Sequence, residues 1–168
     1  MRELLDRHNL FHVPAAINFR DAVVAIIVVD DSRYLMQLRD DKPGIFYPDH
    51  WGLFGGAVDP GEEPEAALRR ELMEELELEP RSLRYFTRMD FDFERFGAGK
   101  VYRIYYEVPL AAAHLSALRL GEGRLMEVLG LPDILMDRRV VPYDSFAVWL
   151  HYADRWGRHA ASRSTPFK

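Results

Sequence analysis

The spacing of apolar and polar residues in the first half of the chain predicts strands, a loop and one helix. Residues 22–29 read AVVAIIVV, and a continuously apolar run of this kind is typical of a strand buried on both faces. A turn at 30–32 leads into a second strand within SRYLMQLRDD, and two prolines and a glycine make 42–50 a loop. A short strand, WGLFGGAV, then enters a glycine turn before a helix that begins at Pro64 and ends near residue 77.

The second half of the chain predicts a hairpin, one more strand and a C-terminal helix. Residues 83–96 alternate apolar and acidic positions, and 100–110 follow a Gly-Ala-Gly turn, so the two segments form an antiparallel pair. Residues 121–128 predict a short strand. A helix is predicted from about residue 143 to residue 156. Its core-facing stripe would be formed by Phe146, Trp149, Leu150 and Ala153. This order of elements indicates a mixed sheet covered by helices, in the α+β or α/β/α class.

Composition narrows the class of protein. The 168 residues suffice for one domain with a core, 48% of them are hydrophobic, and the longest apolar runs are too short to span a bilayer. The N-terminal residues contain no continuous apolar segment of the kind found in secretory signals, and the chain has no cysteine. A net charge of −5 without a Lys/Arg run argues against a nucleic-acid partner. We therefore expect a cytoplasmic protein that binds neither membrane nor nucleic acid.

The helix predicted from Pro64 carries a concentration of acidic residues. Glu71, Glu74 and Glu75 stand at i, i+3 and i+4 on one side of the helix, where like charges cost about 0.2–0.5 kcal/mol per pair. A stripe of leucines beside them is suited to packing the helix on the sheet. Hard divalent cations prefer oxygen ligands, so a metal would convert this repulsion into shared coordination. A solvated acidic face is the alternative that the spacing alone leaves open.

The residues around these glutamates resemble the signature of the Nudix (MutT-like) hydrolases, G-x5-E-x7-R-E-U-x-E-E-x-G-U, where U is aliphatic. Eight of its nine specified positions match, namely Gly56, Glu62, Arg70, Glu71, Leu72, Glu74, Glu75 and Leu78. The resemblance covers most of residues 20–157 and implies the fold of that family, an α/β/α sandwich with a mixed β-sheet. We expect a single Nudix domain over 1–168, with its core at about 20–157 and extensions at both ends.

The resemblance also implies roles for individual residues. The cofactor would be Mg²⁺ or Mn²⁺, and the implied ligands are the Gly56 carbonyl, Glu71, Glu74, Glu75 and, from a loop after the hairpin, Glu122. The implied catalytic residues are Arg70, Glu71, Glu74 and Glu75. Glu71 would be a ligand or the general base, Arg70 would hold the glutamates in register, and Glu62 would be mainly structural. Glu127 is the second choice for the loop carboxylate, and an exposed turn residue is the alternative for Glu122.

The function implied by the resemblance is metal-dependent hydrolysis. A water activated by the metal and a carboxylate base would cleave a diphosphate bond in a nucleoside diphosphate linked to another group. Motifs typical of the members that cleave ADP-ribose, NADH or coenzyme A are absent, which leaves a nucleoside triphosphate or a nucleotide sugar as substrate. The alternative is a non-catalytic Nudix module that senses a nucleotide.

The loop before the glycine turn supplies candidate substrate contacts. Arg39 and Lys42 are candidates for binding phosphate, and Arg39 is favoured because it follows a strand that faces the glutamate helix in this fold. Phe46, Tyr47 and Trp51 are candidates for stacking on a base, with packing under the loop as the alternative.

A homodimer is a further expectation from the resemblance, because Nudix proteins often pair with a second copy. Aromatic residues of the predicted hairpin offer one interface. These residues are Tyr102, Tyr105 and Tyr106, and they could instead belong to the core.

Glu77 is the one departure from the signature, which has glycine at this position. Glycine there ends the helix in a left-handed conformation that costs other residues roughly 1–2 kcal/mol. Pro80 provides a second stop signal, since the residue before proline avoids helical geometry. We predict that Glu77 lies at the helix end, away from the metal.

Overall fold

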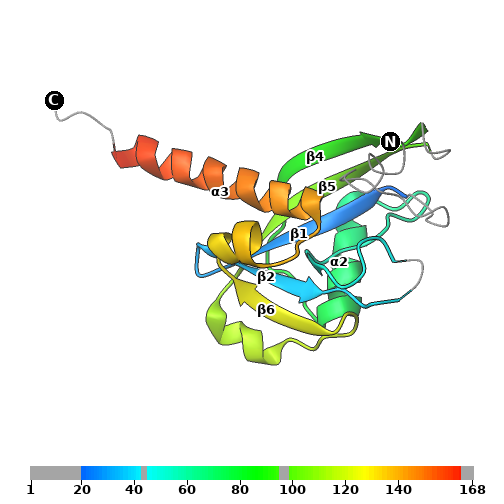
Figure 1. The fold of residues 1–168 in the computed structure, drawn as a ribbon, viewed down its shortest axis with the longest axis horizontal. Coiled ribbons are helices and arrows are strands. Elements are labelled where there is room, and N and C mark those ends of the chain that lie inside the picture. The colour runs from blue at the N-terminus through cyan, green and yellow to red at the C-terminus, as the bar shows by residue number, and fades with distance from the viewer. Residues whose placement is uncertain (1–19, 43–44, 95–98, 164–168) are drawn as a thin grey trace, which may run out of the picture.

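The computed structural model describes residues 20–42, 45–94 and 99–163, which form a six-stranded sheet with helices packed on it (Figure 1). The strands are β1 (Ala22–Val29), β2 (Arg33–Leu38), β3 (Trp51–Gly52), β4 (Arg84–Asp92), β5 (Lys100–Leu110) and β6 (Leu125–Leu129). Their order is β3-β2-β1-β5-β4, with β6 also paired to β2. Strands β1 and β5 run parallel and the other pairs are antiparallel, so the sheet is mixed as the sequence predicts.

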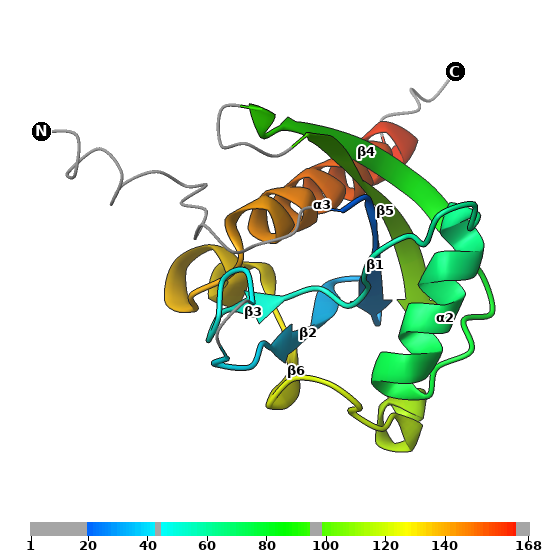
Figure 2. The same cartoon turned by 90° about the vertical axis from the view of Figure 1, so that its right-hand side faces the viewer.

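Strand β1 lies at the centre of the sheet, and all eight of its residues are buried. Its side chains alternate between two faces, as they must in a strand. Val23, Ala25 and Ile27 share a core cluster with leucines of α2 (Pro64–Leu76), whereas Val24 and Ile26 share another with α3 (Pro142–Arg163). Two helices therefore cover opposite faces of the sheet (Figure 2), which confirms the predicted α/β/α sandwich.

The hairpin of β4 and β5 is antiparallel with one irregularity, between Tyr85 and Thr87. Tyr105 and Tyr106 are 0% and 5% exposed, and Tyr102 is partly buried. Tyr105 and Tyr106 are therefore core residues, and Tyr102 packs at the edge of the core. Short helical segments at Ala112–Ala117 and Asp133–Asp137 connect the later elements.

The C-terminal helix α3 differs from its prediction in length and in orientation. It continues to Arg163, and its far end extends beyond the sheet (Figure 1). The stripe predicted to face the core is wrong: Phe146 is 52% exposed and Trp149 is 46% exposed. The buried face instead carries Asp144 and His151, at 2% and 0% exposure, together with small apolar residues between them. Both polar side chains form hydrogen bonds to buried partners. The face of the helix that packs on the sheet is therefore the one whose polar groups are satisfied there, and the aromatic stripe lies outside.

Helix α2 ends as the sequence predicts. Glu77 follows the last helical residue with φ 52° and ψ 33°, in the left-handed conformation. Its N–H donates to the carbonyl of Met73, and the N–H of Leu78 donates to the carbonyl of Leu72, so the turn satisfies two of the last helix carbonyls. The side chain of Glu77 is exposed, so the position keeps its turn geometry without the glycine.

In the part of the chain that the structure describes, no helix combines the length and apolar character needed to cross a membrane.

Candidate active site

Two glycines allow the loop after β3 to pass between β1 and α2. Gly55 has φ +126°, and a Cβ there would lie 2.2 Å from the carbonyl oxygen of Val23. A Cβ on Gly56 would lie 2.4 Å from the carboxyl carbon of Glu71. Only glycine fits at position 55, because a Cβ there would clash with fixed backbone, whereas a Cβ at position 56 would displace the carboxylate of Glu71. The loop backbone is thereby brought against the glutamates of α2.

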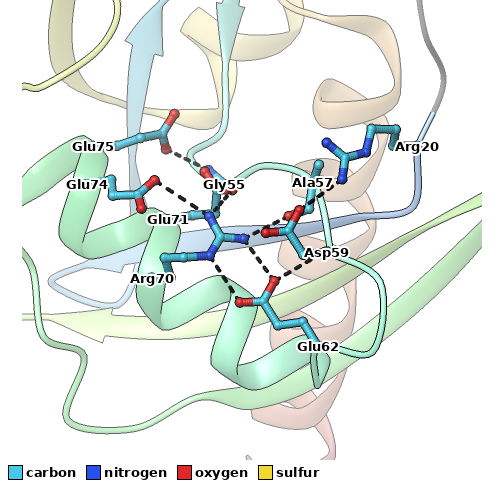
Figure 3. A network of polar contacts seen from close by, with 9 residues as sticks. All are labelled: Arg20, Gly55, Ala57, Asp59, Glu62, Arg70, Glu71, Glu74 and Glu75. Atoms are coloured by element: carbon cyan, nitrogen blue, oxygen red, sulfur yellow. Dashed lines mark hydrogen bonds and ion pairs between the residues drawn. The ribbon is translucent and has the colours of Figure 1, made fainter.

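Arg70 joins this loop to α2 (Figure 3). Its Nε and Nη2 donate to the two carboxylate oxygens of Glu62 at 3.0 and 2.9 Å, a bidentate pair. Nη2 also donates to the Ala57 carbonyl at 3.1 Å, and Nη1 donates to Oε1 of Glu71 at 2.8 Å. The pair with Arg70 lowers the pKa of Glu62. One guanidinium therefore fixes the loop and orients a glutamate of the signature.

Glu75 is the buried carboxylate of the site, with 5% of its surface exposed. Its Oε2 accepts the Gly55 N–H at 2.8 Å, and its Oε1 accepts the Gln37 side-chain amide at 3.2 Å. Both donors are neutral. The pKa of Glu75 is raised to about 7, chiefly by burial, with the charges of Glu71 and Glu122 adding to the rise and the two hydrogen bonds opposing it. The pocket around Glu75 thus holds a carboxylate without a positive partner of its own.

The remaining carboxylates of the site differ in exposure. Burial raises the pKa of Glu71, although its bond to Arg70 opposes the shift. The side chain of Glu74 is 61% exposed and lies 3.6 Å from Nη1 of Arg70. Glu122 is exposed on the loop before β6, close enough that its charge raises the pKa of Glu71. Four carboxylates, three on α2 and one on the loop before β6, therefore lie near enough for their charges to interact.

The loop that carries Glu122 is packed tightly on α2. The N–H of Gly121 donates to the carbonyl of Glu75 at 2.7 Å, and a Cβ at this glycine would lie 2.3 Å from the carbonyl oxygen of Glu74. Glu127, the second choice from the sequence, is placed elsewhere, because it forms an exposed ion pair with Arg138 at 3.3 Å. The structure thus brings Glu122 to the site and leaves Glu127 outside it.

The donor set suits a hard divalent cation. Within the described residues, no three His, Asp or Glu side chains form a ready-made metal cluster. The carboxylates nevertheless repel one another, and buried Glu75 has neutral donors only, so a bound cation would relieve an electrostatic cost present in the site. The Gly56 carbonyl accepts the Val23 N–H at 2.9 Å, which leaves one lone pair for any further ligand.

A cavity of about 240 Å³ lies beside the glycine loop. Its lining comes from the loop, from β1 and β5, and from the start of α3, and includes Arg39, Phe46, Gly55, Gly56, Arg103 and Tyr143. Among the substrate contacts expected from the sequence, Arg39 and Phe46 are therefore placed at the cavity.

Three other expected contacts are not brought to this cavity. Trp51 is 6% exposed and belongs to the core on the α3 side, so it has no free face for a base. Tyr47 packs against Phe46 and Tyr143 at ring distances of 4.5 and 5.9 Å, with its hydroxyl buried. The Lys42 side chain is 68% exposed and pairs with Asp40. Packing under the loop, the alternative interpretation, describes both aromatic residues.

Several site residues were not expected from the sequence. Gln37 is the one polar side chain within the buried run of β2, which is a signal that could have been noticed. Arg103, Tyr143 and Asp144 come from β5 and α3, and nothing local in either segment indicates that they meet.

Comparison with known proteins places this architecture in a family. The family model described as NUDIX domain matches residues 18–148, which is most of the chain. The chain therefore belongs to the NUDIX domain family. Over 54 residues it is 46% identical to the nucleoside triphosphatase NudI of Escherichia coli O1:K1 / APEC. The matched stretch is 32% of this chain and 38% of the length of that relative.

Solved structures share the fold. A MutT protein from Methanosarcina mazei Go1 superposes with a TM-score of 0.63 at 20% identity, over 83% of this chain and 94% of that one. The NUDIX domain of Shewanella oneidensis NrtR, in a complex with ADP ribose, superposes with a TM-score of 0.60 at 19% identity, over 94% and 99%. At such identities the likeness concerns the fold alone.

Proposed function

We propose that this chain hydrolyses a diphosphate bond in a nucleoside diphosphate linked to another group, with Mg²⁺ or Mn²⁺ as cofactor. The observation that carries the proposal is Glu75, a buried carboxylate with neutral donors only and with Glu71 and Glu122 as like-charged neighbours. A buried ion without a counter-charge is costly, and it is retained where a ligand supplies the missing charge.

The carboxylates that we assign to the cation are Glu71, Glu74, Glu75 and Glu122, with the Gly56 carbonyl as a further candidate. When bound, the cation neutralises phosphate charge and lowers the pKa of a coordinated water. Arg70 and Glu62 keep the glycine loop against α2, so that the carboxylates and the cavity stay in register. Arg70 binds Oε1 of Glu71, which leaves Oε2 as the atom suited to accept the proton of the attacking water.

A nucleoside triphosphate is the substrate we favour over a nucleotide sugar. The stretch shared with a protein named nucleoside triphosphatase supports this choice. The cavity of about 240 Å³ beside Gly55 is smaller than the 300–1,000 Å³ typical of drug-sized ligands, which suits one ring system of a larger substrate. The phosphates would then extend from this cavity toward the carboxylates of α2.

A product-mass screen tests the proposal. The protein is incubated with Mg²⁺ or Mn²⁺ and nucleoside triphosphates, nucleotide sugars or dinucleotides, and released phosphate and pyrophosphate are measured. Turnover that requires the cation and is lost in Glu74→Gln and Glu75→Gln supports the proposal. Glu65→Gln is the matched control, because Glu65 is an exposed glutamate in the first turn of the same helix. Equal turnover in all three variants contradicts the proposed roles.

A nucleotide sensor is the second candidate. It is suggested by structural neighbours titled as NrtR complexes, one with ADP ribose and one with a 27mer DNA. The intact set of carboxylates favours catalysis over sensing. Calorimetric binding of a nucleotide without turnover of any member of the panel would favour the sensor.

We also propose a second copy of this chain as partner, with the outer face of α3 as interface. Phe146, Trp149 and Trp156 are 52%, 46% and 66% exposed on this face, and Ala153 lies between the tryptophans. We consider two antiparallel α3 helices in which the numbers of facing residues sum to 302. Phe146 then faces position 156 of the second copy, and Trp149 faces position 153. Each large side chain of the central pair then faces a small one, and the arrangement is self-complementary, as a two-fold interface requires.

The area is compatible with this pairing. The exposed parts of the three aromatic side chains amount to about 300–400 Å² per chain, against about 800 Å² in a standard interface. A groove of about 430 Å³ beside them, lined by Leu135 and Pro142 among others, adds further apolar surface. Light scattering after size exclusion should give a dimer that Trp149→Gln shifts toward monomer. Tyr85→Ser, an exposed aromatic on β4, is the control, and a monomeric wild type at micromolar concentration contradicts the interface.

A further inference from the structure

The cavity beside the glycine loop is lined by charged side chains of one sign. Its charged residues are Arg20, Arg39 and Arg103, and no Asp, Glu, Asn or Gln of the described chain lines it. Guanidinium groups donate hydrogen bonds and cannot accept them. The side-chain polar edge of this cavity is therefore made of donors, apart from the hydroxyl of Tyr143, which can do either.

Arg103 is held in place without using up its donors. Its guanidinium lies 4.6 Å from the centre of the Tyr143 ring, a cation–π contact. Its nearest carboxylate atom is Oδ1 of Asp144, 3.9 Å from Nη2 and beyond hydrogen-bond distance. Its Nε is buried without a hydrogen-bond partner. Asp144 in turn accepts the Leu53 N–H at 3.1 Å and the Tyr105 hydroxyl at 3.3 Å, so it serves as a fixed support behind the arginine.

Arg39 adds a second guanidinium with donors to spare. Its Nε donates to the Phe46 carbonyl at 3.1 Å, and within the described residues it has no carboxylate in ion-pair distance. Arg20 differs, since it pairs with Asp59 at 2.9 Å. Among the described residues, Arg103 thus has Asp144 as a counter-charge at 3.9 Å, whereas Arg39 has no carboxylate within ion-pair distance.

The walls of the cavity are flat and apolar. Phe46 and Tyr143 lie nearly parallel, with ring centres 6.0 Å apart and planes at 11°. Phe91 and Phe93 are likewise stacked, at 5.8 Å and 5°. The walls are therefore aromatic and apolar, and donors at their edge would select among planar ligand rings by the acceptors that the rings present.

We propose that this cavity selects nucleobases whose edge presents acceptors, with Arg103 as the specificity-determining residue and Arg39 as its helper. The favoured rings are guanine and hypoxanthine, through O6 and N7, and uracil and thymine, through their carbonyls. Adenine presents its N6 amino group where these rings present an oxygen, so a donor would face a donor. The inference rests on the proposed hydrolysis at the same site.

Matched substrates test the inference. Hypoxanthine differs from adenine by an oxygen in place of the N6 amino group, and uracil differs from cytosine in the same way at position 4. We expect kcat/KM to be roughly 10- to 100-fold higher for dITP than for dATP, with the same direction for dUTP against dCTP, since one good base contact discriminates by about that factor. The dGTP and dTTP arms show whether purines or pyrimidines fit better.

Variants then assign the selectivity to the arginine. In Arg103→Gln the dITP/dATP ratio should fall close to one, while Arg103→Lys should keep part of it. The double variant Arg103→Gln/Asp144→Asn removes the buried carboxylate that Arg103 would otherwise leave behind, in case the single variant folds poorly. Arg88→Gln is the control, because Arg88 is an exposed arginine of the same hairpin that does not line the cavity.

Each outcome is informative. Turnover of no nucleotide or nucleotide sugar overturns the proposed function itself. Turnover with dATP at least equal to dITP overturns the selectivity while hydrolysis stands. A dITP preference that survives unchanged in folded Arg103 variants overturns the role of Arg103.

Discussion

Two buried glutamates on opposite sides of the sheet show how differently one side chain can be accommodated. Glu75 on α2 and Glu107 on β5 are each 5% exposed. Glu107 contacts Arg84, accepts a bond from Nη1 of Arg155 at 3.0 Å, and lies 2.9 Å from Nε2 of His151. Glu75 accepts bonds from neutral donors only.

We interpret this difference as that between a structural carboxylate and the carboxylate proposed to bind a cation. A buried charge is tolerated when the chain supplies opposite charge and hydrogen bonds to it. Glu107 receives both from the helix and strand around it, so it needs nothing from outside. Glu75 lacks opposite charge and has Glu71 and Glu122 nearby, which is why we propose that a bound cation completes its surroundings. The four predictions below test this contrast, from the largest expected effect to the smallest.

Glu75→Gln should abolish most activity and leave the fold intact. We expect kcat to fall by about 10³- to 10⁴-fold, equivalent to roughly 4–5 kcal/mol of transition-state stabilisation, because the amide cannot hold the cation. The free energy of unfolding without metal should stay equal or rise, since a buried charge is removed. Steady-state kinetics with Mg²⁺ and urea unfolding give the two numbers. A large loss of stability would show that Glu75 is structural.

Glu107→Gln should give the opposite result. Removing this charge leaves Arg155 and its neighbours with positive charge at a mostly buried site, so we expect a loss of about 3–4 kcal/mol in the free energy of unfolding. Activity measured well below the melting temperature should change less than threefold. Lost activity at unchanged stability would place Glu107 in the catalytic machinery.

His151 gives the cluster around Glu107 a pH dependence. Burial lowers the pKa of His151 to about 4 from the usual 6.5, with Arg155 and Arg158 adding repulsion. A neutral ring with its proton on Nε2 satisfies both neighbours, donating to Glu107 and accepting from the hydroxyl of Tyr34.

The folded state binds this proton more weakly than the unfolded state does. Its stabilising contribution is therefore complete above pH 6.5 and is lost as the pH falls toward 4, by about 2–3 kcal/mol. Urea unfolding of wild type and His151→Gln between pH 7 and 4.5 measures this, because other groups cancel in the difference. The gap between the two proteins should shrink with acidity. A gap that widens would mean a charged imidazole paired with Glu107.

Glu77→Gly should produce the smallest effect. Relief of the left-handed conformation at φ 52° favours glycine by roughly 1 kcal/mol, offset in part by the greater freedom of glycine in the unfolded chain. Thermal unfolding should show a rise of a few degrees or less, with metal-dependent turnover unchanged. Abolished turnover in a folded Glu77→Gly protein would contradict the placement of Glu77 away from the metal.

Local patterns predicted the scaffold well. The eight apolar residues of β1 form a strand buried on both faces, and the hairpin and α2 begin and end within a few residues of their predicted positions. These elements depend on near neighbours in the sequence, on the two-residue period of a strand and on the turn residues that bound a helix. The carboxylates of α2 and Glu122 were also named from the sequence.

The orientation of α3 shows where local patterns fail. An aromatic stripe predicted one buried face, whereas Asp144 and His151 occupy the buried face that forms. Their partners, such as Leu53 and Tyr34, lie far away in the sequence, so no pattern within the helix reveals them. The candidate role of Trp51 in binding substrate failed for the same reason, because the burial of Trp51 depends on elements that pack over it.

The sequence by itself determined the order of strands and helices and the acidic edge of α2, since periodicity and spacing encode both. Only the tertiary structure decided that Arg103, Tyr143 and Arg39 share one cavity, and that Glu107 is compensated whereas Glu75 is not. Such decisions depend on side chains that meet across the sheet, and the energy of a buried charge is set by those long-range neighbours.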